Sequence, residues 1–447
     1  MQGGFVLKSI RKAKKRLIVY KALYKSKLKI GGCLCLAFAI AFAGFMGVDQ
    51  FDPEQRTVRI GANADMIPVV TTVVRAAEVN ARALEHGLAS GLEIDAKAAL
   101  LMDAGSGTVL FEKNADEQLP PASVTKVMTM LLVMEAVARG QVTLDDMVTI
   151  SERAARMGGS QMYMEPGEQH TLSELMLGIA MASANDACVA VAEHVSGTVE
   201  IFVERMNQRA AELGMENTNF VNTNGLPVAN HFSSAYDIAL MSRELLRHPI
   251  SKEWFTTWQH TIHVGLPGRE TEFVLTNTNR LIRQYTGADG IKTGFTQDAG
   301  YCLSGSATRG EMTLIAVVLG SPSSQIRFDG AMTMLDYGFA TYDTVKIAQQ
   351  GEPLGSVRIE KGNPDIVNAV ADQDLFILVK KGEQDGITTG LELAYKMRAP
   401  LEKGQKLGDI IIFENGQEIE RHPLIAEEKI EKASFSQLYI RMMKNLI

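Results

Sequence analysis

Three short motifs, far apart along this 447-residue chain, constrain its fold more than any other feature of the sequence. They are S-V-T-K at 123–126, S-A-N at 183–185 and K-T-G at 292–294. Together they supply a nucleophilic hydroxyl, a lysine base, a polar pair that can relay protons, and a cation for a carboxylate. Each motif alone is weak evidence, because S-x-x-K and K-T-G arise by chance. As an ordered set they predict a fold that brings all three segments to one cleft and an enzyme that transfers acyl groups.

The residues around the first motif favour a helix that begins at the nucleophile. Two prolines precede Ser123 and an apolar run follows at 127–137, a pattern typical of a helix N-terminus. Ser123 is therefore expected in the first turn, where unpaired backbone N–H groups stabilise a developing anion. Lys126 lies one turn later on the same face, beside apolar residues that should desolvate its ammonium group and lower its pKa. The alternative is an ordinary solvated lysine.

The second and third motifs have contexts that suit a binding cleft. Ser183 and Asn185 separate two apolar helical stretches, where a short turn can direct both side chains into a cleft or cap a helix. The K-T-G motif follows turn residues and reads as a strand, so Lys292 and Gly294 share one face. Lys292 and the Thr293 hydroxyl can bind a carboxylate, while Gly294 lets a substrate backbone lie close.

Longer blocks of sequence extend the pattern over most of the chain. The blocks are P-P-A-S-V-T-K-V-M-T at 120–129, G-G-S-Q-M at 158–162, A-S-A-N-D-A at 182–187, E-L-G-M-E-N-T-N-F at 212–220, T-N-G-L-P at 223–227 and D-G-I-K-T-G at 289–294. Through them the chain resembles the serine D-alanyl-D-alanine carboxypeptidases, the low-molecular-mass penicillin-binding proteins. This resemblance implies an α+β, penicillin-binding/β-lactamase-like transpeptidase fold. In that fold an antiparallel sheet is flanked by helices and joined to a helical subdomain.

The same resemblance assigns catalytic roles to four residues. Ser123 would be the acylated nucleophile and Lys126 its base. Ser183 and Asn185 would relay protons and hold the substrate amide.

Five further residues would bind the substrate. Lys292 and Thr293 would hold the terminal carboxylate, beside Gly294. The backbone N–H of Phe295 would join that of the nucleophile in an oxyanion hole. Arg327 matches a family arginine on the carboxylate side of the cleft.

The reaction implied by the resemblance is removal of the terminal D-Ala from peptidoglycan stem pentapeptides through an acyl-enzyme. Penicillin and other β-lactams would acylate the same serine. A serine β-lactamase shares the three motifs, but the E-x-x-L-N element that would supply its second base is absent between the second and third motifs. A penicillin sensor or cell-wall scaffold without catalysis is a further alternative, and the intact motifs count against it. Transpeptidation stays open, because water and an amine compete for one acyl-enzyme.

The N-terminal segment predicts export from the cytoplasm. The first 29 residues are rich in Lys and Arg and contain no acid, and residues 30–48 are uncharged and apolar. Such a segment can span a bilayer, and its basic flank places the remainder outside. It also fits a secretory signal, so cleavage stays open. We therefore expect residues 1–48 to be a signal or transmembrane segment, residues 49–91 a linker, and the enzyme to work on the extracytoplasmic face of the bacterial cytoplasmic membrane.

Charge and cysteine content exclude other classes of function. The chain carries a net charge of −7, and it becomes more acidic once the basic N-terminus is set aside, which argues against nucleic acid as a partner. Neither a histidine pair with metal-ligand spacing nor a C-x-x-C motif is present, so no metal or cofactor is expected. Cys188 and Cys302 are either a disulfide pair in an oxidising compartment or buried free thiols.

The chain after the first 91 residues divides into three parts. Residues 92–341 contain all the motifs and form the predicted carboxypeptidase domain. Residues 342–426 alternate short apolar runs with turns, which predicts a small all-β domain. Residues 427–447 carry apolar side chains, including Ile430 and Phe435, mostly at three- and four-residue steps with basic neighbours. This predicts an amphipathic helix that lies in a membrane interface or packs on its own domain.

Overall fold

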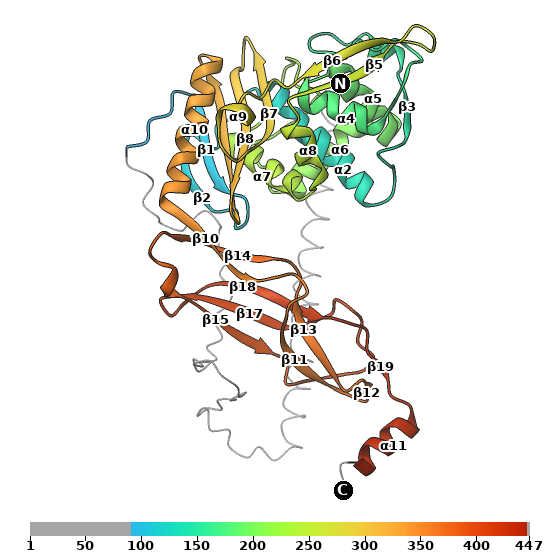
Figure 1. Cartoon of the computed structure of the whole chain (residues 1–447), viewed down its shortest axis with the longest axis vertical. Coiled ribbons are helices and arrows are strands. Elements are labelled where there is room, and N and C mark those ends of the chain that lie inside the picture. The colour runs from blue at the N-terminus through green and yellow to red at the C-terminus, as the bar shows by residue number, and fades with distance from the viewer. Residues whose placement is uncertain (1–90, 445–447) are drawn as a thin grey trace, which may run out of the picture. The chain divides into compact units, whose positions relative to one another are not determined.

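A computed structural model describes residues 91–444 of the chain (Figure 1). The elements up to the end of the predicted catalytic domain are β1 (Ala98–Asp103), β2 (Val109–Lys113), η1 (Ala122–Thr125), α2 (Lys126–Ala138), β3 (Met147–Thr149), α3 (Glu152–Ala155), β4 (Gln169–Thr171), α4 (Leu172–Met181), α5 (Asn185–Ser196), α6 (Val199–Glu212), α7 (Ala235–Leu246), α8 (Ile250–Thr256), β5 (Gln259–Val264), β6 (Thr271–Thr276), α9 (Leu281–Gln284), β7 (Ala288–Thr296), β8 (Gly300–Arg309), β9 (Met312–Ser321) and α10 (Ser324–Thr341).

The later elements are almost all strands. They are β10 (Tyr342–Ala348), β11 (Pro353–Glu360), β12 (Gly362–Asn363), β13 (Ile366–Ala371), β14 (Leu375–Lys380), η2 (Gln384–Gly386), β15 (Ile387–Leu393), β16 (Lys396–Arg398), β17 (Lys406–Glu414), β18 (Gln417–Ala426), β19 (Glu431–Lys432) and α11 (Phe435–Lys444). The predicted signal or transmembrane segment and all but the last residue of the predicted linker lie outside the described residues. Within 91–444, no helix has both the length and the apolar content that a membrane span requires.

A five-stranded antiparallel sheet, in the order β2-β1-β9-β8-β7, forms the centre of the first domain. Helix α10 packs against β8 and β9, and α2 and α7 belong to the core on the other face (Figure 1). Strand β7, which carries the K-T-G motif, is an edge strand, so one side of its backbone is free of sheet partners. Both helices and strands contribute to the domain, so the predicted α+β class is confirmed.

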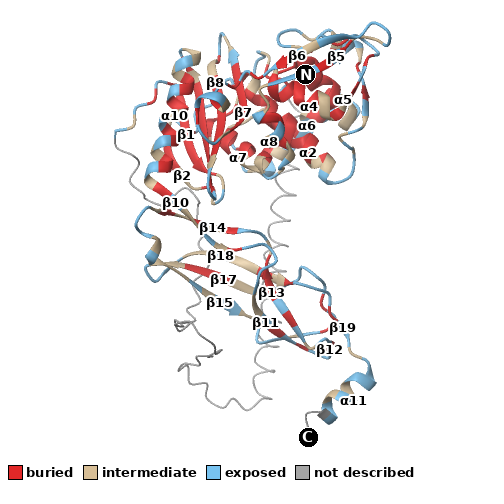
Figure 2. Cartoon of the chain, viewed as in Figure 1, coloured by how far each residue is buried: buried red, intermediate tan, exposed pale blue. Residues whose placement is uncertain are grey.

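The inner strands β1 and β9 are almost continuously apolar because both faces of the sheet are covered, whereas β8 also carries the buried serines Ser304 and Ser306. Alternate residues face opposite cores: Leu100 and Ile315 join the core of α2, whereas Leu101 and Leu314 join that of α10. A Cβ atom at Gly338 of α10 would lie 2.5 Å from Leu314 Cδ1, so glycine lets this helix approach the sheet. Figure 2 shows buried residues gathered in the sheet and in the helices beside it.

A helical subdomain between β2 and β7 holds the second motif. Helices α4 and α5 are almost entirely buried and are separated only by residues 182–184. A capping box fixes the start of α4, where the Thr171 and Glu174 side chains each bond to the other's backbone N–H. Ser183 of the S-A-N motif therefore lies in a turn between two helices, as its apolar flanks predicted, and Asn185 begins the second helix.

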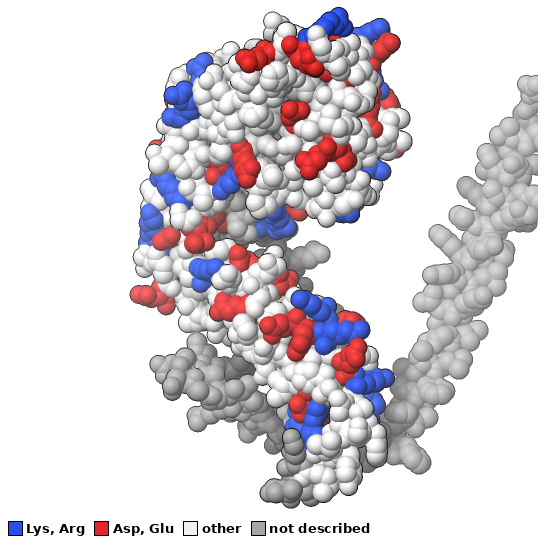
Figure 3. Space-filling view, turned by 45° about the vertical axis from the view of Figure 1, so that its right-hand side comes forward, with Lys and Arg blue, Asp and Glu red and all other residues white. Residues whose placement is uncertain are grey.

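The second domain is built from strands, as predicted from the alternation of apolar runs and turns. Its largest sheet has six strands in the order β15-β17-β18-β13-β11-β16, and β10 pairs with β14. Alternate apolar residues of β11, β13 and β18 form a separate core. On the face in Figure 3, acidic and basic side chains are interspersed rather than gathered by sign.

The predicted start of the C-terminal helix is wrong. Ile430, expected on its apolar stripe, is fully buried in the core of the β domain. Its backbone exchanges hydrogen bonds with Leu401, at 2.9 and 2.8 Å, so this segment is extended. The helix, α11, begins only at Phe435. Three- and four-residue spacing cannot distinguish a residue that completes a β core from the first turn of a helix.

Candidate active site

The segment around the predicted nucleophile does not start as the α-helix that the sequence suggested. Ser123 lies in η1, one turn of 3-10 helix, which continues directly into α2 at Lys126. The tighter turn keeps the two side chains on one face, with Lys126 Nζ 2.9 Å from Ser123 Oγ. The residue before the serine, Ala122, has a φ of 48°, a conformation that non-glycine residues rarely adopt.

Lys126 is completely buried, and its amino group has three oxygen partners. They are Ser123 Oγ at 2.9 Å, Asn185 Oδ1 at 2.8 Å and the Asn224 carbonyl oxygen at 2.6 Å. The last two oxygens can only accept hydrogen bonds. They therefore take both N–H bonds of a neutral amine and leave its lone pair facing the serine hydroxyl. Burial lowers the pKa of Lys126 to about 8, although the nearby Asp186 carboxylate opposes this shift.

Asn185 lies at the first position of α5, and both ends of its amide are occupied. Its Oδ1 accepts from Lys126, and its Nδ2 donates to the Gly158 carbonyl at 2.6 Å. Neither Asn185 nor Ser183 makes a side-chain cap for α5. The structure thus gives Asn185 a direct part in orienting the lysine, in addition to the substrate contact implied by the family resemblance.

Ser183 has an unusual backbone and an unused hydroxyl. Its φ is 62°, and its side chain is buried. Among the described residues, the Ser183 hydroxyl has no hydrogen-bond partner. Because a buried hydroxyl without a partner is costly, this group is suited to bonding a substrate or relaying a proton.

Lys292 and Thr293 lie on β7, and Lys292 is close enough to Lys126 for the two charges to repel one another. Lys292 is fully buried, and its Nζ donates to the Thr293 carbonyl at 3.1 Å. Burial lowers the pKa of Lys292 well below its usual value, and repulsion from Lys126 lowers it further. A bound carboxylate would favour the charged form of Lys292. The Thr293 hydroxyl lies 2.7 Å from that of Thr278, which fixes its position.

Gly294 lets the edge strand approach the nucleophile. A Cβ atom there would lie 3.0 Å from both the backbone nitrogen of Ser123 and the carbonyl oxygen of Pro121. The sequence suggested close approach of a substrate, and the structure shows that η1 itself needs this space. Strand β7 contacts η1 closely, so the N–H groups of Ser123 and Phe295 belong to neighbouring segments.

Phe295 and Arg327 lie at the same end of β7, in different environments. The Phe295 side chain is 52% exposed and stacks on Tyr301 with ring centroids 4.4 Å apart. Arg327, on α10, is buried and donates to the carbonyl oxygens of Gly294 at 3.2 Å and Cys302 at 3.0 Å. Burial lowers the pKa of Arg327 to about 10. Arg327 therefore bridges β7 and β8 through their backbones.

A hydrogen-bonded relay that the sequence did not predict supports the nucleophile segment. His231 Nδ1 accepts from the Val221 backbone N–H at 3.0 Å, so its proton must be on Nε2. Nε2 then donates to Thr125 Oγ1 at 2.8 Å, and Thr125 donates to the Ala122 carbonyl at 2.8 Å. Burial lowers the pKa of His231 to about 4, which keeps the ring neutral. The relay holds the carbonyl of the residue next to the nucleophile.

The T-N-G-L-P block at 223–227 also contributes to the site. Asn224 supplies the carbonyl that accepts from Lys126. Gly225 has a φ of 82°, and a Cβ atom there would overlap the Ala122 carbonyl oxygen. The block was visible in the sequence, but its roles were not, because a backbone carbonyl and a missing Cβ leave no chemical signature.

Asp186 is a further residue to which sequence reasoning assigned no role. It is buried, and its carboxylate accepts from the backbone N–H groups of Met162 at 2.9 Å and Tyr163 at 3.0 Å. Burial raises the pKa of Asp186, and these hydrogen bonds oppose that shift. The bonds fix the loop that contains Gly158, the partner of the Asn185 amide.

The cysteine alternatives are resolved in favour of free thiols. Cys188 and Cys302 are both buried and unpaired with one another. Burial raises the pKa of each thiol to about 11, which keeps both in the unreactive protonated form. Within residues 91–444, no group of three or more His, Cys, Asp or Glu residues is arranged to hold a metal ion.

Comparison with known families and proteins identifies two regions. A family model described as D-alanyl-D-alanine carboxypeptidase matches residues 85–323. A second, described as the C-terminal domain of penicillin-binding protein 5, matches residues 342–432. These matches confirm the resemblance seen in the sequence motifs.

Individual relatives agree with the family matches. The chain is 41% identical over 355 residues to D-alanyl-D-alanine carboxypeptidase DacF of Bacillus subtilis (strain 168), covering 79% of this chain and 90% of that protein. It is 38% identical to D-alanyl-D-alanine carboxypeptidase DacC of Escherichia coli (strain K12), covering 76% and 86%. The crystal structure of penicillin-binding protein 5 from Haemophilus influenzae matches with a TM-score of 0.63 and 34% identity, covering 76% of this chain and 98% of that one. The predicted penicillin-binding fold is confirmed.

Proposed function

Because this chain belongs to the family of D-alanyl-D-alanine carboxypeptidases, we propose that Ser123 is the nucleophile of its peptidase reaction. The enzyme is a serine-type D,D-carboxypeptidase that removes the terminal D-Ala from peptidoglycan stem pentapeptides through an acyl-enzyme. The observation that carries the assignment of the nucleophile is the 2.9 Å contact between Lys126 Nζ and Ser123 Oγ. The comparisons favour neither the serine β-lactamase nor the penicillin-sensing scaffold.

Acylation begins with proton transfer from Ser123 to neutral Lys126. Ser123 Oγ then attacks the carbonyl carbon of the penultimate D-Ala, and the backbone N–H groups of Ser123 and Phe295 stabilise the resulting oxyanion. Collapse of this intermediate breaks the C–N bond. The leaving amine takes the proton from Lys126 through the unpartnered hydroxyl of Ser183, and D-Ala departs.

Deacylation reverses the proton transfers with water in place of the amine. Lys126, neutral again, removes a proton from the water that attacks the ester carbonyl carbon. The ester C–O bond breaks and Ser123 regains its proton. A β-lactam acylates the same serine when its ring opens, but its amine stays tethered in the site, and the acyl-enzyme is therefore slow to react further.

Lys292 and Thr293 bind the carboxylate of the terminal D-Ala. The charge of that carboxylate stabilises the ammonium form of Lys292, whose pKa burial and Lys126 otherwise lower. Binding of the substrate thus charges one lysine, and the added positive charge helps to keep Lys126 neutral. In this scheme Lys292 binds the substrate carboxylate and Lys126 acts as the base.

The test of the nucleophile is mass spectrometry of residues 91–447 after incubation with penicillin and, separately, with a pentapeptide ending in D-Ala-D-Ala. We expect one penicilloyl adduct on Ser123 and release of free D-Ala. Ser123→Ala should form no adduct and lose turnover by about 10⁴-fold or more. An adduct mapped to any other serine, or undiminished turnover in Ser123→Ala, would contradict the assignment.

The substrate lies outside the cytoplasm, and we propose that α11 holds the enzyme to the outer surface of the cytoplasmic membrane. The apolar side chains of α11 are unusually exposed, with Phe435 at 85%, Tyr439 at 53% and Ile440 at 55%. Arg441 binds Asp365 at 3.4 Å and the Gly362 carbonyl at 3.1 Å, which ties the helix to the β domain. Exposed apolar side chains gathered on one short helix suit the interfacial layer of a membrane.

The membrane proposal is tested with a protein that starts at residue 91. Because Ile430 belongs to the β core, the truncation must begin at Phe435 rather than earlier. We expect residues 91–447 to sediment with anionic liposomes and residues 91–434 to stay in solution with the same D-Ala release. Equal sedimentation of both would show that α11 is not the membrane contact. The double variant Phe435→Ser/Ile440→Ser is the matched counterpart of the truncation, because it removes two exposed apolar side chains of α11 but keeps the chain length.

A further inference from the structure

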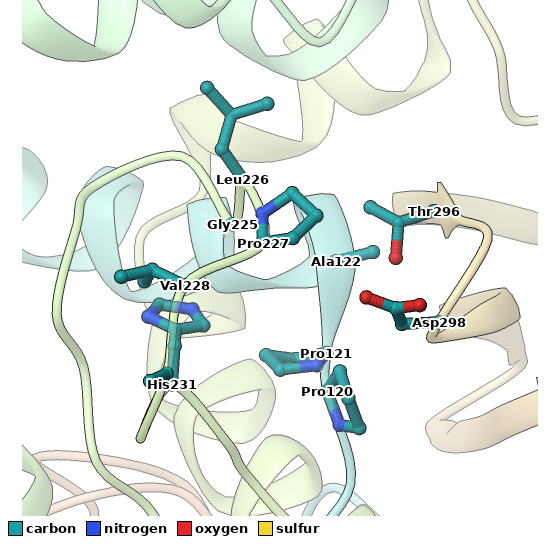
Figure 4. A pocket seen from close by; sticks show the side chains of 11 residues that line it. Pro120, Pro121, Ala122, Gly225, Leu226, Pro227, Val228, His231, Thr296 and Asp298 are labelled. Carbon is teal, nitrogen blue, oxygen red and sulfur yellow. The ribbon is translucent and has the colours of Figure 1, made fainter.

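A cavity of about 390 Å³ adjoins the nucleophile segment. It lies between residues 120–122, the loop at 225–231 and the turn from β7 to β8, and Figure 4 shows the side chains that line it. Ala122 belongs to the lining and is bonded directly to Ser123, so the cavity lies beside the proposed nucleophile.

The cavity combines apolar walls with a single charge. One wall carries Leu226, Pro227 and Val228, and the Asp298 carboxylate extends from the other side toward Ala122 (Figure 4). His231 also lines it but is neutral, and both of its ring nitrogens are already bonded. Asp298 is therefore the one charged side chain among the described residues that line the cavity.

No contact that the Asp298 side chain makes within the described structure explains why a carboxylate stands at this position. It lies in the exposed turn between β7 and β8. Within residues 91–444 it makes neither a hydrogen bond nor an ion pair. Its neighbour Thr296 accepts from the Ala299 N–H at 3.1 Å, and that bond shapes the turn without involving the carboxylate. The charge of Asp298 is thus available to a ligand.

The direction of the substrate follows from the proposed roles of β7. The terminal carboxylate lies at Lys292 and Thr293, and the oxyanion of the scissile carbonyl lies at the Phe295 N–H. A peptide that adds to the free edge of β7 therefore runs antiparallel to it, with its earlier residues toward Thr296. At about 3.4 Å per residue, the side chain before the two D-Ala residues reaches the cavity beyond Thr296.

We propose that this cavity binds the side chain of the residue before D-Ala-D-Ala, and that Asp298 selects a side chain ending in a free amine. The apolar wall fits a stem of methylene groups, and the carboxylate pairs with the terminal ammonium. An amine with no carboxylate beside it is preferred, because a second carboxylate would face Asp298 with like charge. The proposal rests on the peptidase function and on Ser123 as nucleophile.

The test compares three peptides whose side chain at that position ends in a positive, a neutral or a negative group. They are Nα-acetyl-L-Lys-D-Ala-D-Ala, the same peptide acetylated at Nε, and the same peptide succinylated at Nε. For the wild type we expect kcat/KM to fall in the order amine, acetyl, succinyl, by about two- to fivefold at each step at low salt. High salt should compress the differences.

Two substitutions then decide whether Asp298 is the cause. Asp298→Asn should remove most of the preference, and Asp298→Lys should reverse it, so that the succinylated peptide becomes the best of the three. Glu311→Lys is the matched control, because it makes the same change in net charge at an exposed turn between β8 and β9 that does not line the cavity. The control should keep the wild-type order.

The outcomes separate this proposal from the function on which it rests. If Asp298→Lys cleaves the three peptides in the wild-type order, the cavity does not bind this side chain through Asp298. The same conclusion follows if the wild type shows no preference. If no peptide releases D-Ala and penicillin leaves Ser123 unmodified, the assignment of the active site has failed instead.

Discussion

The rate of acylation by penicillin should depend on pH through Lys126. Burial lowers the pKa of this lysine from a usual value of 10.5 to about 8. Its neutral form is the only one with a lone pair for the serine proton. At pH 7 about one-tenth of the molecules then carry the neutral base, against about 0.03% for an ordinary lysine. The fold thus supplies roughly 300 times more active base at neutral pH.

The measurement is the second-order rate constant of acylation between pH 5 and 10. Below pH 8 the rate should rise about tenfold per pH unit, because the population of neutral Lys126 rises in that proportion. Above pH 8 it should level off, since the base is already neutral. A profile that is flat down to pH 5, or one that still rises beyond pH 9.5, would refute the reasoning.

Substitution of the base tests the same step independently. Lys126→Arg should acylate about 10²–10⁴-fold more slowly, because guanidinium does not lose its proton at any pH tested. Lys396→Arg is the control: Lys396 is exposed and pairs with Glu360 at 2.8 Å in the β domain. Thermal unfolding of both variants reports whether the larger side chain at 126 disturbs the fold. A folded Lys126→Arg protein that acylates at the wild-type rate would show that another group takes the serine proton.

Two further predictions follow from the carboxylate clamp and from the relay behind the nucleophile. Lys292→Ala should reduce kcat/KM for a pentapeptide by at least tenfold more than for the same peptide amidated at its C-terminus, and equal losses would show a purely structural role. His231→Phe should lower kcat about tenfold without moving the pH profile, because it frees the Ala122 segment while leaving Lys126 in place. His231→Gln, whose amide can accept from Val221 and donate to Thr125, should restore much of that loss, and a Gln variant as slow as Phe would argue against the relay.

The sequence predicted the parts of the site whose chemistry is local. Ser123 and Lys126 are one turn apart, so their contact follows from helical geometry alone. Apolar flanks placed Ser183 and Asn185 in a turn between buried helices, and turn residues placed Lys292 on a strand. The strand and the turn at Ser183 are observed, but Ser123 lies in a 3-10 turn and Asn185 is already the first residue of α5. What connects them is long-range, and no residue pattern encodes the 2.8 Å contact between Lys126 and Asn185.

The parts that sequence reasoning missed act through the backbone or through burial. Asn224 contributes a carbonyl oxygen, which every residue type has, so its identity gives no hint of the role. His231 belongs to none of the motifs, and its function depends on a neutral tautomer that only its partners define. Ile430 shows the reverse error, since an apolar residue at nearly helical spacing instead completes a β core.

Each of the three motifs includes or adjoins a non-glycine residue with positive φ, and these residues explain how the motifs meet. Ala122 precedes the nucleophile at 48°, Ser183 opens the second motif at 62°, and Ile291 precedes Lys292 at 89°. Such conformations cost about 1–3 kcal/mol each and persist only where the surroundings enforce them. At Ala122 the enforcing contact is the hydrogen bond from Thr125, with Gly225 leaving room for the carbonyl. With regular helical or extended φ values at these residues, each segment would continue along the axis of its helix or strand instead of turning. The strained residues turn the chain immediately before or at the side chains of the proposed site, so the stability spent there helps to bring the proposed nucleophile, proton relay and carboxylate clamp together.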